Sequence, residues 1–471
     1  MEVFQLSSWK KHVSEHTEDE VMKQLNSLPV DIRYRAEDRL HVAFHRERHT
    51  RLSRLELFFM LIGPGILVMI ADNDAGGVIT YAQTGAIFGI GFFIPFMLLM
   101  LPVAYFVQEM TVRLGAVTHR GHAELIWKHY GKFWGSFSLG DLVIANFLTL
   151  ITEFIGITVG LSIFGVPRIF SAAVFVCIVI AIQLFLRYFT WERVSLFIAV
   201  FNLVFIPLLL FLPHPAWSQV AASFATWRIN GGVSSLFIYV LLANLGTTIA
   251  PWMLFFQQSS VVDKGLTEKD IKFGQRDTLI GSAVMVAVAI AIIMLTGMTV
   301  YGSAVRGTPG IDNILLSFEA RVGVFPMELF AAGLIEAGFI AAIAISASTS
   351  WAMSEAFGWK KSINLPARDG VMFYLPSFAS LAVAASVTLI PGAPLGYLNL
   401  TVQVIATIFM PAAMLFLLLL LNDKGIMGDH TNKRWQNAIG FSIIGFLILM
   451  NALYGLSIAL PALFNHIVGW L

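Results

Sequence analysis

The sequence is poor in charged residues and contains a single cysteine. Asp, Glu, Lys and Arg make up 13% of the 471 residues, whereas apolar types make up 57%. A soluble domain averages about 25% charged and about 45–50% apolar residues, so this chain has too few charges to cover a water-exposed surface. Its 30 basic and 29 acidic residues leave no basic surplus of the kind that nucleic-acid binding requires. The lone Cys177 excludes both a disulfide framework within the chain and a cysteine-ligated metal cluster.

Long apolar segments dominate the chain after Arg54. A membrane-spanning helix needs about 20 mostly apolar residues. We therefore predict an all-α polytopic membrane protein, without a soluble catalytic domain. Its eleven transmembrane helices are expected at residues 55–90, 92–112, 138–164, 169–188, 194–212, 234–260, 278–302, 326–356, 371–390, 397–421 and 438–463.

The orientation follows from the loops, because cytoplasmic loops carry an excess of Lys and Arg. Residues 1–54 hold many charges and have no apolar run typical of a signal peptide, so we predict a cytoplasmic N-terminal tail. If successive loops then alternate between the two sides of the membrane, only four basic residues lie in outside loops: Arg168, Arg228, Arg306 and Arg321. The C-terminus is then outside, and the protein is expected in a cell membrane of the bacterial inner-membrane type.

Two of the predicted helices contain helix-breaking residues near their midpoints. The first includes Ala71-Asp72-Asn73-Asp74-Ala75-Gly76-Gly77, and the sixth includes Ala243-Asn244-Leu245-Gly246-Thr247-Thr248-Ile249-Ala250-Pro251-Trp252. Interruptions at corresponding positions of two halves are typical of inverted-repeat transporters with a site at the membrane midplane. We therefore predict a first repeat over 55–212 (helices 1–5), a second over 234–421 (helices 6–10) and an eleventh helix over 438–463.

The break in the first helix holds two carboxylates, Asp72 and Asp74. A charged residue at the bilayer centre costs about 2.5–3.5 kcal/mol even on a lenient scale and marks a functional site by default. No Lys, Arg or His lies in the core of a predicted span to neutralise them. A bound cation is the natural counter-charge, and oxygen ligands favour hard divalent ions such as Mg²⁺, Ca²⁺ or Mn²⁺.

Several motifs in this order resemble the NRAMP family of divalent metal transporters. They are Gly63-Pro64-Gly65, Asp74-Ala75-Gly76-Gly77, Gln83-Thr84-Gly85-Ala86 and Glu153-Phe154-Ile155-Gly156, with Gln403 in the tenth helix. The resemblance implies a LeuT-type fold with pseudo-symmetric helices 1–5 and 6–10. It also implies a metal ion that is the transported substrate, with no cofactor.

The departures from the family pattern change the expected substrate. The family's metal-binding Asn in helix 1 is replaced by Gly77, its metal-binding Met in helix 6 by Ala250, and the neighbouring His by Trp252. A thioether favours transition metals, whereas Mg²⁺ usually keeps several waters and needs room. The sequence is thus similar to the NRAMP-related magnesium transporters, and we expect a partly hydrated Mg²⁺, with Mn²⁺ also accepted.

The resemblance implies residue roles at the break. The expected metal site comprises Asp74, Gly77, Thr247, Ala250, Gln403 and Ala71, with backbone carbonyls near Ala71 and Thr247. The expected pathway or surrounding residues are Asp72, Asn73, Trp252, Asn244, Glu153 and Glu336. Asp72 either contacts the hydrated ion, caps a half-helix or faces an aqueous vestibule. Glu336 either lines the path or has a structural role.

Proton coupling is not expected, because no His lies inside a predicted span. The membrane potential alone favours inward movement of a dication by about 4.6 kcal/mol per 100 mV. Two alternatives stay open: a proton-coupled Mn²⁺/Fe²⁺ transporter, and a LeuT-type transporter of a small organic solute. An intramembrane enzyme lacks its motifs here. The expected partners are divalent ions and the lipid bilayer, with no nucleic acid and a monomeric protein.

Overall fold

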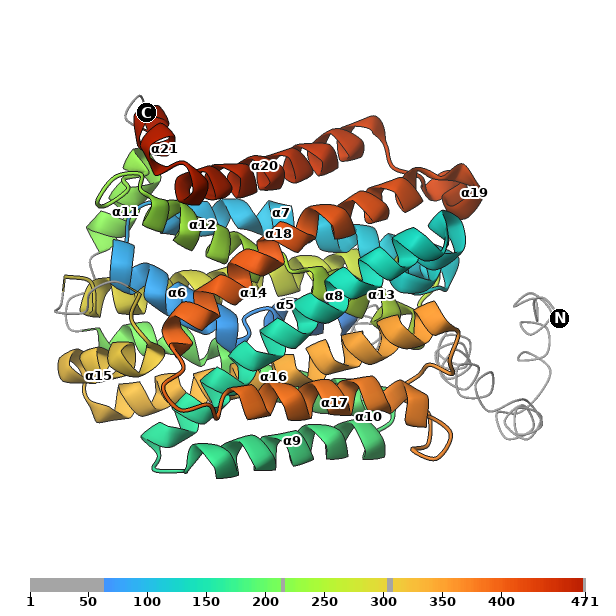
Figure 1. The fold of residues 1–471 in the computed structure, drawn as a ribbon, viewed down its shortest axis with the longest axis horizontal. Helices are drawn as coiled ribbons and strands as arrows, with labels where there is room; N and C mark the ends of the chain where they lie inside the picture. The colour runs from blue at the N-terminus through green and yellow to red at the C-terminus, as the bar shows by residue number, and fades with distance from the viewer. Residues whose placement is uncertain (1–62, 213–216, 303–307, 469–471) are drawn as a thin grey trace, which may run out of the picture.

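The computed structural model describes residues 63–212, 217–302 and 308–468 (Figure 1). The predicted tail at 1–54 lies outside this described part. Within it, nine helical segments are long and apolar enough to span a membrane. They are α7 (Phe93–Thr118), α8 (His122–Ile163), α9 (Arg168–Phe185), α10 with its 3₁₀ continuation (Tyr188–Phe211), α12 with α13 (Ser235–Asp263), α14 with a preceding 3₁₀ turn (Glu268–Thr299), α16 (Val324–Phe357), α18 (Leu395–Asn422) and α20 (Arg434–Ala459).

The two remaining predicted spans are also helical but do not reach that length. The first span is divided into α5 (Pro64–Ala71) and α6 (Ala75–Phe88), and the ninth is the 17-residue α17 (Val371–Val387). The all-helical class is thus confirmed. The total of eleven spans and the inverted repeat stay predictions.

The interrupted helices form the centre of the bundle. Figure 1 shows α5 and α6 in the middle of the molecule, with α20 along one edge and α9 along the opposite one. In the most apolar part of Ser235–Asp263, 94% of the residues are buried, against 17% in Arg434–Ala459. An interrupted backbone is tolerated at membrane depth only where protein or a water-filled cavity surrounds it, which explains why the two breaks are central.

The fifth predicted span differs from the expected regular helix. α10 (Tyr188–Ala199) is followed by two 3₁₀ segments, η1 (Val200–Phe205) and η2 (Pro207–Phe211). Pro207, which has no N–H to donate to the preceding turn, is the first residue of η2. The continuous apolar character of the segment concealed this change.

Two other boundaries differ from prediction, and short helices occur between the predicted spans. α8 begins well before residue 138 and bends at Gly131, where φ is +80°, a value that glycine adopts without steric cost. The last predicted span, 438–463, ends at Ala459 and is followed by α21 (Pro461–Val468). Short helices α11 (Trp217–Thr226), α15 (Ile311–Val322) and α19 (Lys424–Met427) lie in the connections.

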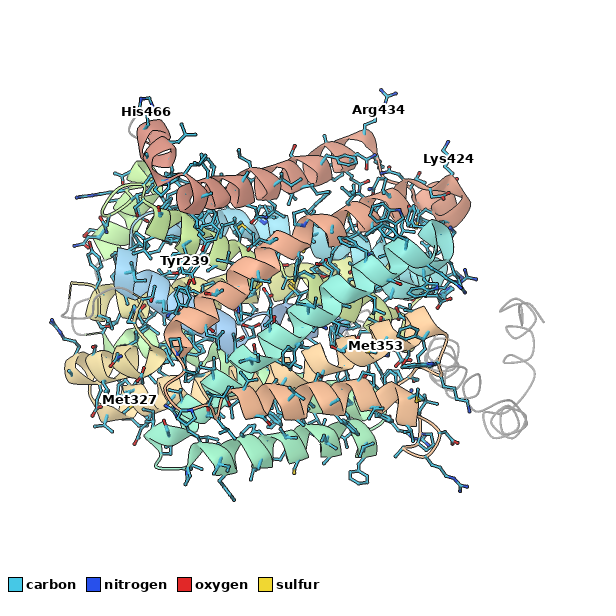
Figure 2. The ribbon with its side chains drawn as sticks, in the orientation of Figure 1. Tyr239, Met327, Met353, Lys424, Arg434 and His466 are labelled. Carbon is cyan, nitrogen blue, oxygen red and sulfur yellow. The ribbon has the colours of Figure 1, made fainter. Side chains whose placement is uncertain are left out.

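The outside of the bundle is apolar along its length and charged at its ends. Large apolar side chains that are at least four-fifths exposed occur on α9, α10 and η2: Phe185, Phe197 and Leu210. Lys424 and Arg434 lie together at one end of the bundle, and His466 lies at the other (Figure 2). Met327 and Met353, near the two ends of α16, lie toward opposite ends of the bundle. This distribution suits a protein surrounded by lipid.

Candidate functional site

The first break consists of Asp72, Asn73 and Asp74, between α5 and α6. Asp74 is the N-cap of α6, and its Oδ1 accepts the N–H of Gly77 at 2.5 Å. Asp is preferred at an N-cap because its carboxylate pairs with N–H groups that have no partner inside the helix. The negative charge of Asp74 is thereby held at the positive end of the α6 dipole.

The second break consists of Ile249 and Ala250, between α12 (Ser235–Thr248) and α13 (Pro251–Asp263). Pro251 is the first residue of α13, a position that tolerates the missing proline N–H. The N–H of Ala250 donates to the Met253 sulfur at 3.4 Å. The Met253 thioether therefore lies over the start of α13.

Two oxygen atoms of the first break and one from the end of α12 converge beside Gly77. A Cβ atom at Gly77 would lie 2.6 Å from Thr247 Oγ1, 3.1 Å from Asp74 Oδ1 and 3.2 Å from the Asp72 carbonyl oxygen. Thr247 Oγ1 is buried and has no hydrogen-bond partner among the described residues. The space left by the glycine is thus bordered by a carboxylate, a hydroxyl and a backbone carbonyl.

Asp72 is a second carboxylate whose negative charge has no described partner. Its side chain is 0% exposed, and neither carboxylate oxygen has a hydrogen-bond partner in the described part of the chain. The Asp72 and Asp74 charges repel each other, and Tyr81, whose hydroxyl lies 3.3 Å from Thr248 Oγ1, is within electrostatic reach of both. Removing a charge from water without a partner costs several kcal/mol, so the break demands a cation or protons.

Glu153 of α8 adds a third carboxylate at the start of α6. Its Oε2 accepts the N–H of Ala75 at 2.8 Å, and its Oε1 accepts the Thr152 hydroxyl at 3.1 Å. The Glu153 and Asp74 carboxyl groups lie beside each other. Glu153 therefore acts on the break both as a cap for α6 and as a neighbouring charge.

Gln403 of α18 contacts the same helix start from the other side. A Cβ atom at Gly76 would lie 2.3 Å from Gln403 Nε2 and 2.6 Å from Thr152 Oγ1. Gln403 Nε2 is buried and has no partner among the described residues. Asn399, one turn earlier, donates to the Gly76 carbonyl at 3.1 Å. Gln403 thus lies beside the first break, and its predicted role as a metal ligand stays a prediction. Asn399, Thr152 and Tyr81 are neighbours that sequence reasoning missed.

The two alanines of the predicted metal set have no side-chain donor. Ala71 is the fully buried last residue of α5, and Ala250 is 4% exposed. The carbonyl beside Gly77 belongs to Asp72, one residue after the predicted Ala71, and Thr247 contributes its hydroxyl there. The sequence had predicted backbone carbonyls only near Ala71 and near Thr247, without naming the residue that supplies each.

Three of the predicted surrounding residues make other contacts. Asn244 Nδ2 donates to Thr84 Oγ1 at 2.7 Å and to the Val240 carbonyl at 2.8 Å, which joins α12 to α6. Trp252 packs edge-on against Phe256, and its ring nitrogen is buried without a partner in the described part. Asn73 Nδ2 donates to Asn202 Oδ1 at 3.3 Å.

Glu336 of α16 belongs to a separate group of polar side chains. Its Oε2 accepts Asn202 Nδ2 at 3.1 Å. Because Asn202 also binds Asn73, Glu336 is connected to the first break through η1. Among the described residues, no cluster of three or more His, Cys, Asp or Glu side chains has the arrangement of a metal site. Any metal ion at the break therefore needs hydroxyl, carbonyl or amide oxygens, or water, beside the carboxylates.

Comparison with known families identifies the chain. Residues 65–457 match the model of the family described as natural resistance-associated macrophage protein-like, Nramp. The chain belongs to the Nramp family. A relative in Staphylococcus saprophyticus, the divalent metal cation transporter MntH, is 26% identical over 424 residues, which cover 83% of this chain and 91% of the relative.

Solved structures agree with the Nramp fold. The Eremococcus coleocola manganese transporter in complex with a bis-isothiourea compound has a TM-score of 0.71 at 20% identity, covering 86% of this chain and 88% of the other. MhsT in complex with L-phenylalanine has a TM-score of 0.54 at 16% identity, covering 86% and 98% of the two chains. At these identities the likeness shows the fold alone.

Proposed function

We propose that this Nramp protein transports divalent cations across a cell membrane, with Mg²⁺ as its preferred substrate and Mn²⁺ also accepted. The observation that carries the proposal is the convergence of Asp74 Oδ1, Thr247 Oγ1 and the Asp72 carbonyl on the space beside Gly77. Hard divalent cations prefer such oxygen ligands. The relatives named for divalent metal and manganese transport support the broader class.

The preference for Mg²⁺ rests on what the two breaks lack. Gly77 and Ala250 contribute no donor side chain, and the Met253 sulfur accepts the Ala250 N–H. Without a thioether ligand the site has no soft donor with which to favour Mn²⁺. The extra room expected from the sequence is not seen at Gly77, because a Cβ atom there would already lie 2.6 Å from Thr247 Oγ1. The preference therefore rests on the missing thioether.

Transport in this proposal is driven by the ion gradient and the membrane potential. The tail is cytoplasmic, the protein is a monomer, and the ion crosses by alternating access between the two repeats. The uncompensated Asp72 provides a second negative charge that attracts a hydrated dication. Waters between Asp72 and the ion would satisfy the two free carboxylate oxygens.

One observation favours the alternative of proton-coupled Mn²⁺ transport. The adjacent carboxyl groups of Asp74 and Glu153 form a pair that can hold a proton, because two neighbouring carboxylates resist double ionisation. The other alternative, a LeuT-type transporter of a small organic solute, is less favoured where that solute carries a carboxylate. Both Asp74 and Glu153 occupy the α6 start, where a substrate carboxylate would otherwise bind.

The test is uptake into proteoliposomes of Mg²⁺, Mn²⁺ and Ca²⁺, with an internal pH dye. We expect Mg²⁺ uptake that Mn²⁺ competes with, and no acidification inside beyond that of empty liposomes. The variant Asp74→Asn keeps an N-cap acceptor for Gly77 and removes only the charge, so uptake should fall at least about tenfold.

Asp423→Asn is the matched control, because Asp423 caps α19 with the same kind of contact, to Gly425 N at 2.7 Å. This variant should transport like the unmodified protein. The magnesium assignment would be contradicted if Mn²⁺ is taken up while Mg²⁺ is neither transported nor able to inhibit Mn²⁺ uptake. Substrate-dependent internal acidification would support the proton-coupled alternative.

A further inference from the structure

Glu336 is a buried carboxylate that the divalent-ion site does not use. It lies on α16, is 7% exposed, and is bound by one described donor, Asn202 Nδ2 at 3.1 Å from Oε2. Its other oxygen, Oε1, is buried without a hydrogen-bond partner in the described ranges. None of the ion pairs found among the described residues involves Glu336.

Asn202 of η1 joins this carboxylate to the first break. The same Nδ2 atom that donates to Glu336 also donates to the backbone carbonyl of Asn73 at 3.2 Å. In return, Asn73 Nδ2 donates to Asn202 Oδ1 at 3.3 Å and to the Met285 carbonyl of α14 at 3.1 Å. The Glu336 carboxylate and the Asn73 carbonyl are therefore held around one amide group, at the C-terminal end of α5.

Close packing fixes this arrangement. A Cβ atom at Gly333, three residues before Glu336, would lie 2.7 Å from the Phe205 ring and 2.8 Å from a Val204 methyl group. α16 can approach η1 this closely only because residue 333 is glycine. Glu336 and Asn202 are thus presented to each other by two segments in direct contact.

The group has more acceptors than donors. Besides Glu336 Oε1, the side-chain oxygen of Asn73 is buried with no partner among the described residues. A proton on Glu336 would supply one donor, whereas a cation can bind several oxygens at once. The negative end of the α5 dipole also favours a cation here, and unwound carbonyls at half-helix ends coordinate Na⁺ in broken-helix transporters.

We propose that Glu336, with the Asn73 carbonyl and side-chain oxygens, forms a second cation site, and that its ligand is a monovalent alkali ion, Na⁺. One carboxylate among neutral oxygens matches a single positive charge. The ion links α5, η1 and α16 and so stabilises the broken backbone that presents Asp74. This site is separate from the one beside Gly77, and Na⁺ binding there requires no divalent ion.

The test is thermal unfolding of the purified full-length protein in detergent, with a chelator present and without divalent ions. Na⁺ is titrated against choline at constant ionic strength. Since a ligand that binds only the folded state raises its stability by mass action, the unfolding midpoint should rise with Na⁺ and then level off. Glu336→Gln keeps an acceptor for Asn202 but loses the charge, and it should abolish the Na⁺-dependent rise.

Glu355→Gln is the matched control. Glu355 lies on the same helix, is 6% exposed, and also has one oxygen without a partner in the described part. This variant should keep the full Na⁺ response. If Glu336→Gln does not fold, Glu336→Asp retains the charge on a shorter side chain and should need at least about tenfold more Na⁺ for half of the rise.

Two results would overturn the assignment. One is the absence of an Na⁺-specific rise in the unmodified protein, or a rise that persists in Glu336→Gln. The other is a midpoint that responds to pH but not to Na⁺, with the pH response lost in Glu336→Gln, because Glu336 would then hold a proton. Neither result bears on the divalent-ion proposal, which uptake selectivity tests separately.

Discussion

Asp277 of α14 accepts the backbone N–H of Gly65 at 2.7 Å and thereby caps the first turn of α5. The same carboxylate accepts the N–H groups of Gly63 at 3.1 Å and Ile66 at 3.2 Å. These N–H groups have no partner within α5, as at any helix start. The half-helix that leads to the divalent-ion site is therefore fastened by a residue more than 200 positions away in the chain.

Removing this cap should destabilise the protein. Asp277→Ala leaves two buried N–H groups and one partly buried N–H group without their acceptor, so we expect a loss of roughly 2–3 kcal/mol in the free energy of unfolding. Asp277→Asn keeps one acceptor oxygen and should lose less. Thermal unfolding in detergent measures both, with the exposed Asp369→Ala as control. A midpoint for Asp277→Ala equal to that of the control would show that the cap contributes nothing.

The cap also illustrates what the sequence can and cannot predict. The break at residues 72–74 was predictable, because acidic and glycine residues interrupt an apolar run within a few positions. The same holds for Pro251. Asp277 was not predictable, because its role depends on α14 packing against α5, and no local pattern marks that contact. The 3₁₀ segments after Ala199 were missed for a different reason: Pro207 gave a signal, but the apolar run around it was read as one helix.

At the candidate site, residue chemistry was predictable and side-chain direction was not. Asp74 and Thr247 meet beside Gly77, as the two-break pattern implied. Asn73 and Asn244 were expected only as pathway or surrounding residues, and the sequence did not indicate that their amides bind Asn202 and Thr84. Such choices depend on which helix faces each side chain, which a single sequence does not contain.

The close contact at Gly76 should be essential for transport. In Gly76→Ala the new methyl group would meet Gln403 Nε2 at 2.3 Å and Thr152 Oγ1 at 2.6 Å, so these two side chains must leave their positions beside the first break or α6 must shift. We expect divalent-ion uptake to fall by about tenfold or more, because a displacement of about 1 Å at a site can cost 100-fold. Uptake into proteoliposomes at equal protein content measures the effect.

Gly140→Ala is the matched control for this substitution. Gly140 is also helical, on α8, and a Cβ atom there would meet nothing within 4 Å. Since alanine has the higher helix propensity by up to about 1 kcal/mol, this variant should keep full uptake and equal or greater stability. Equal uptake by the two variants would mean that the contact at Gly76 is not required.

The buried ion pair of Glu192 and Lys264 should show strong coupling. Lys264 Nζ lies 2.7 Å from Glu192 Oε2, and the side chains are 0% and 4% exposed. Lys264→Met leaves Glu192 charged and buried, which typically costs 3–5 kcal/mol. The double variant Lys264→Met, Glu192→Leu removes both charges, and its loss should be smaller than the sum of the two single losses.

Unfolding midpoints of the two single variants and the double variant complete this thermodynamic cycle. The pair of Lys128 and Glu124 at 2.6 Å, in which Lys128 is 52% and Glu124 15% exposed, serves as control. Lys128→Met should change stability by less than about 1 kcal/mol. If the stability losses of the two single variants add up to that of the double variant, Glu192 and Lys264 do not stabilise each other, and each charge has another partner.

Restoring a thioether at the second break should change the ion preference. Ala250 is buried at the start of α13, three residues after Thr247. In Ala250→Met a second thioether enters beside Met253, whose sulfur already accepts the N–H of residue 250, so Mn²⁺ should be bound about tenfold more tightly and Mg²⁺ uptake should fall. Competition between the two ions for uptake measures the change. Ala250→Leu adds similar apolar bulk without sulfur, and it should weaken uptake of both ions. A methionine variant that behaves like the leucine variant would mean that bulk alone decides the result, and the argument from the missing thioether would then be wrong.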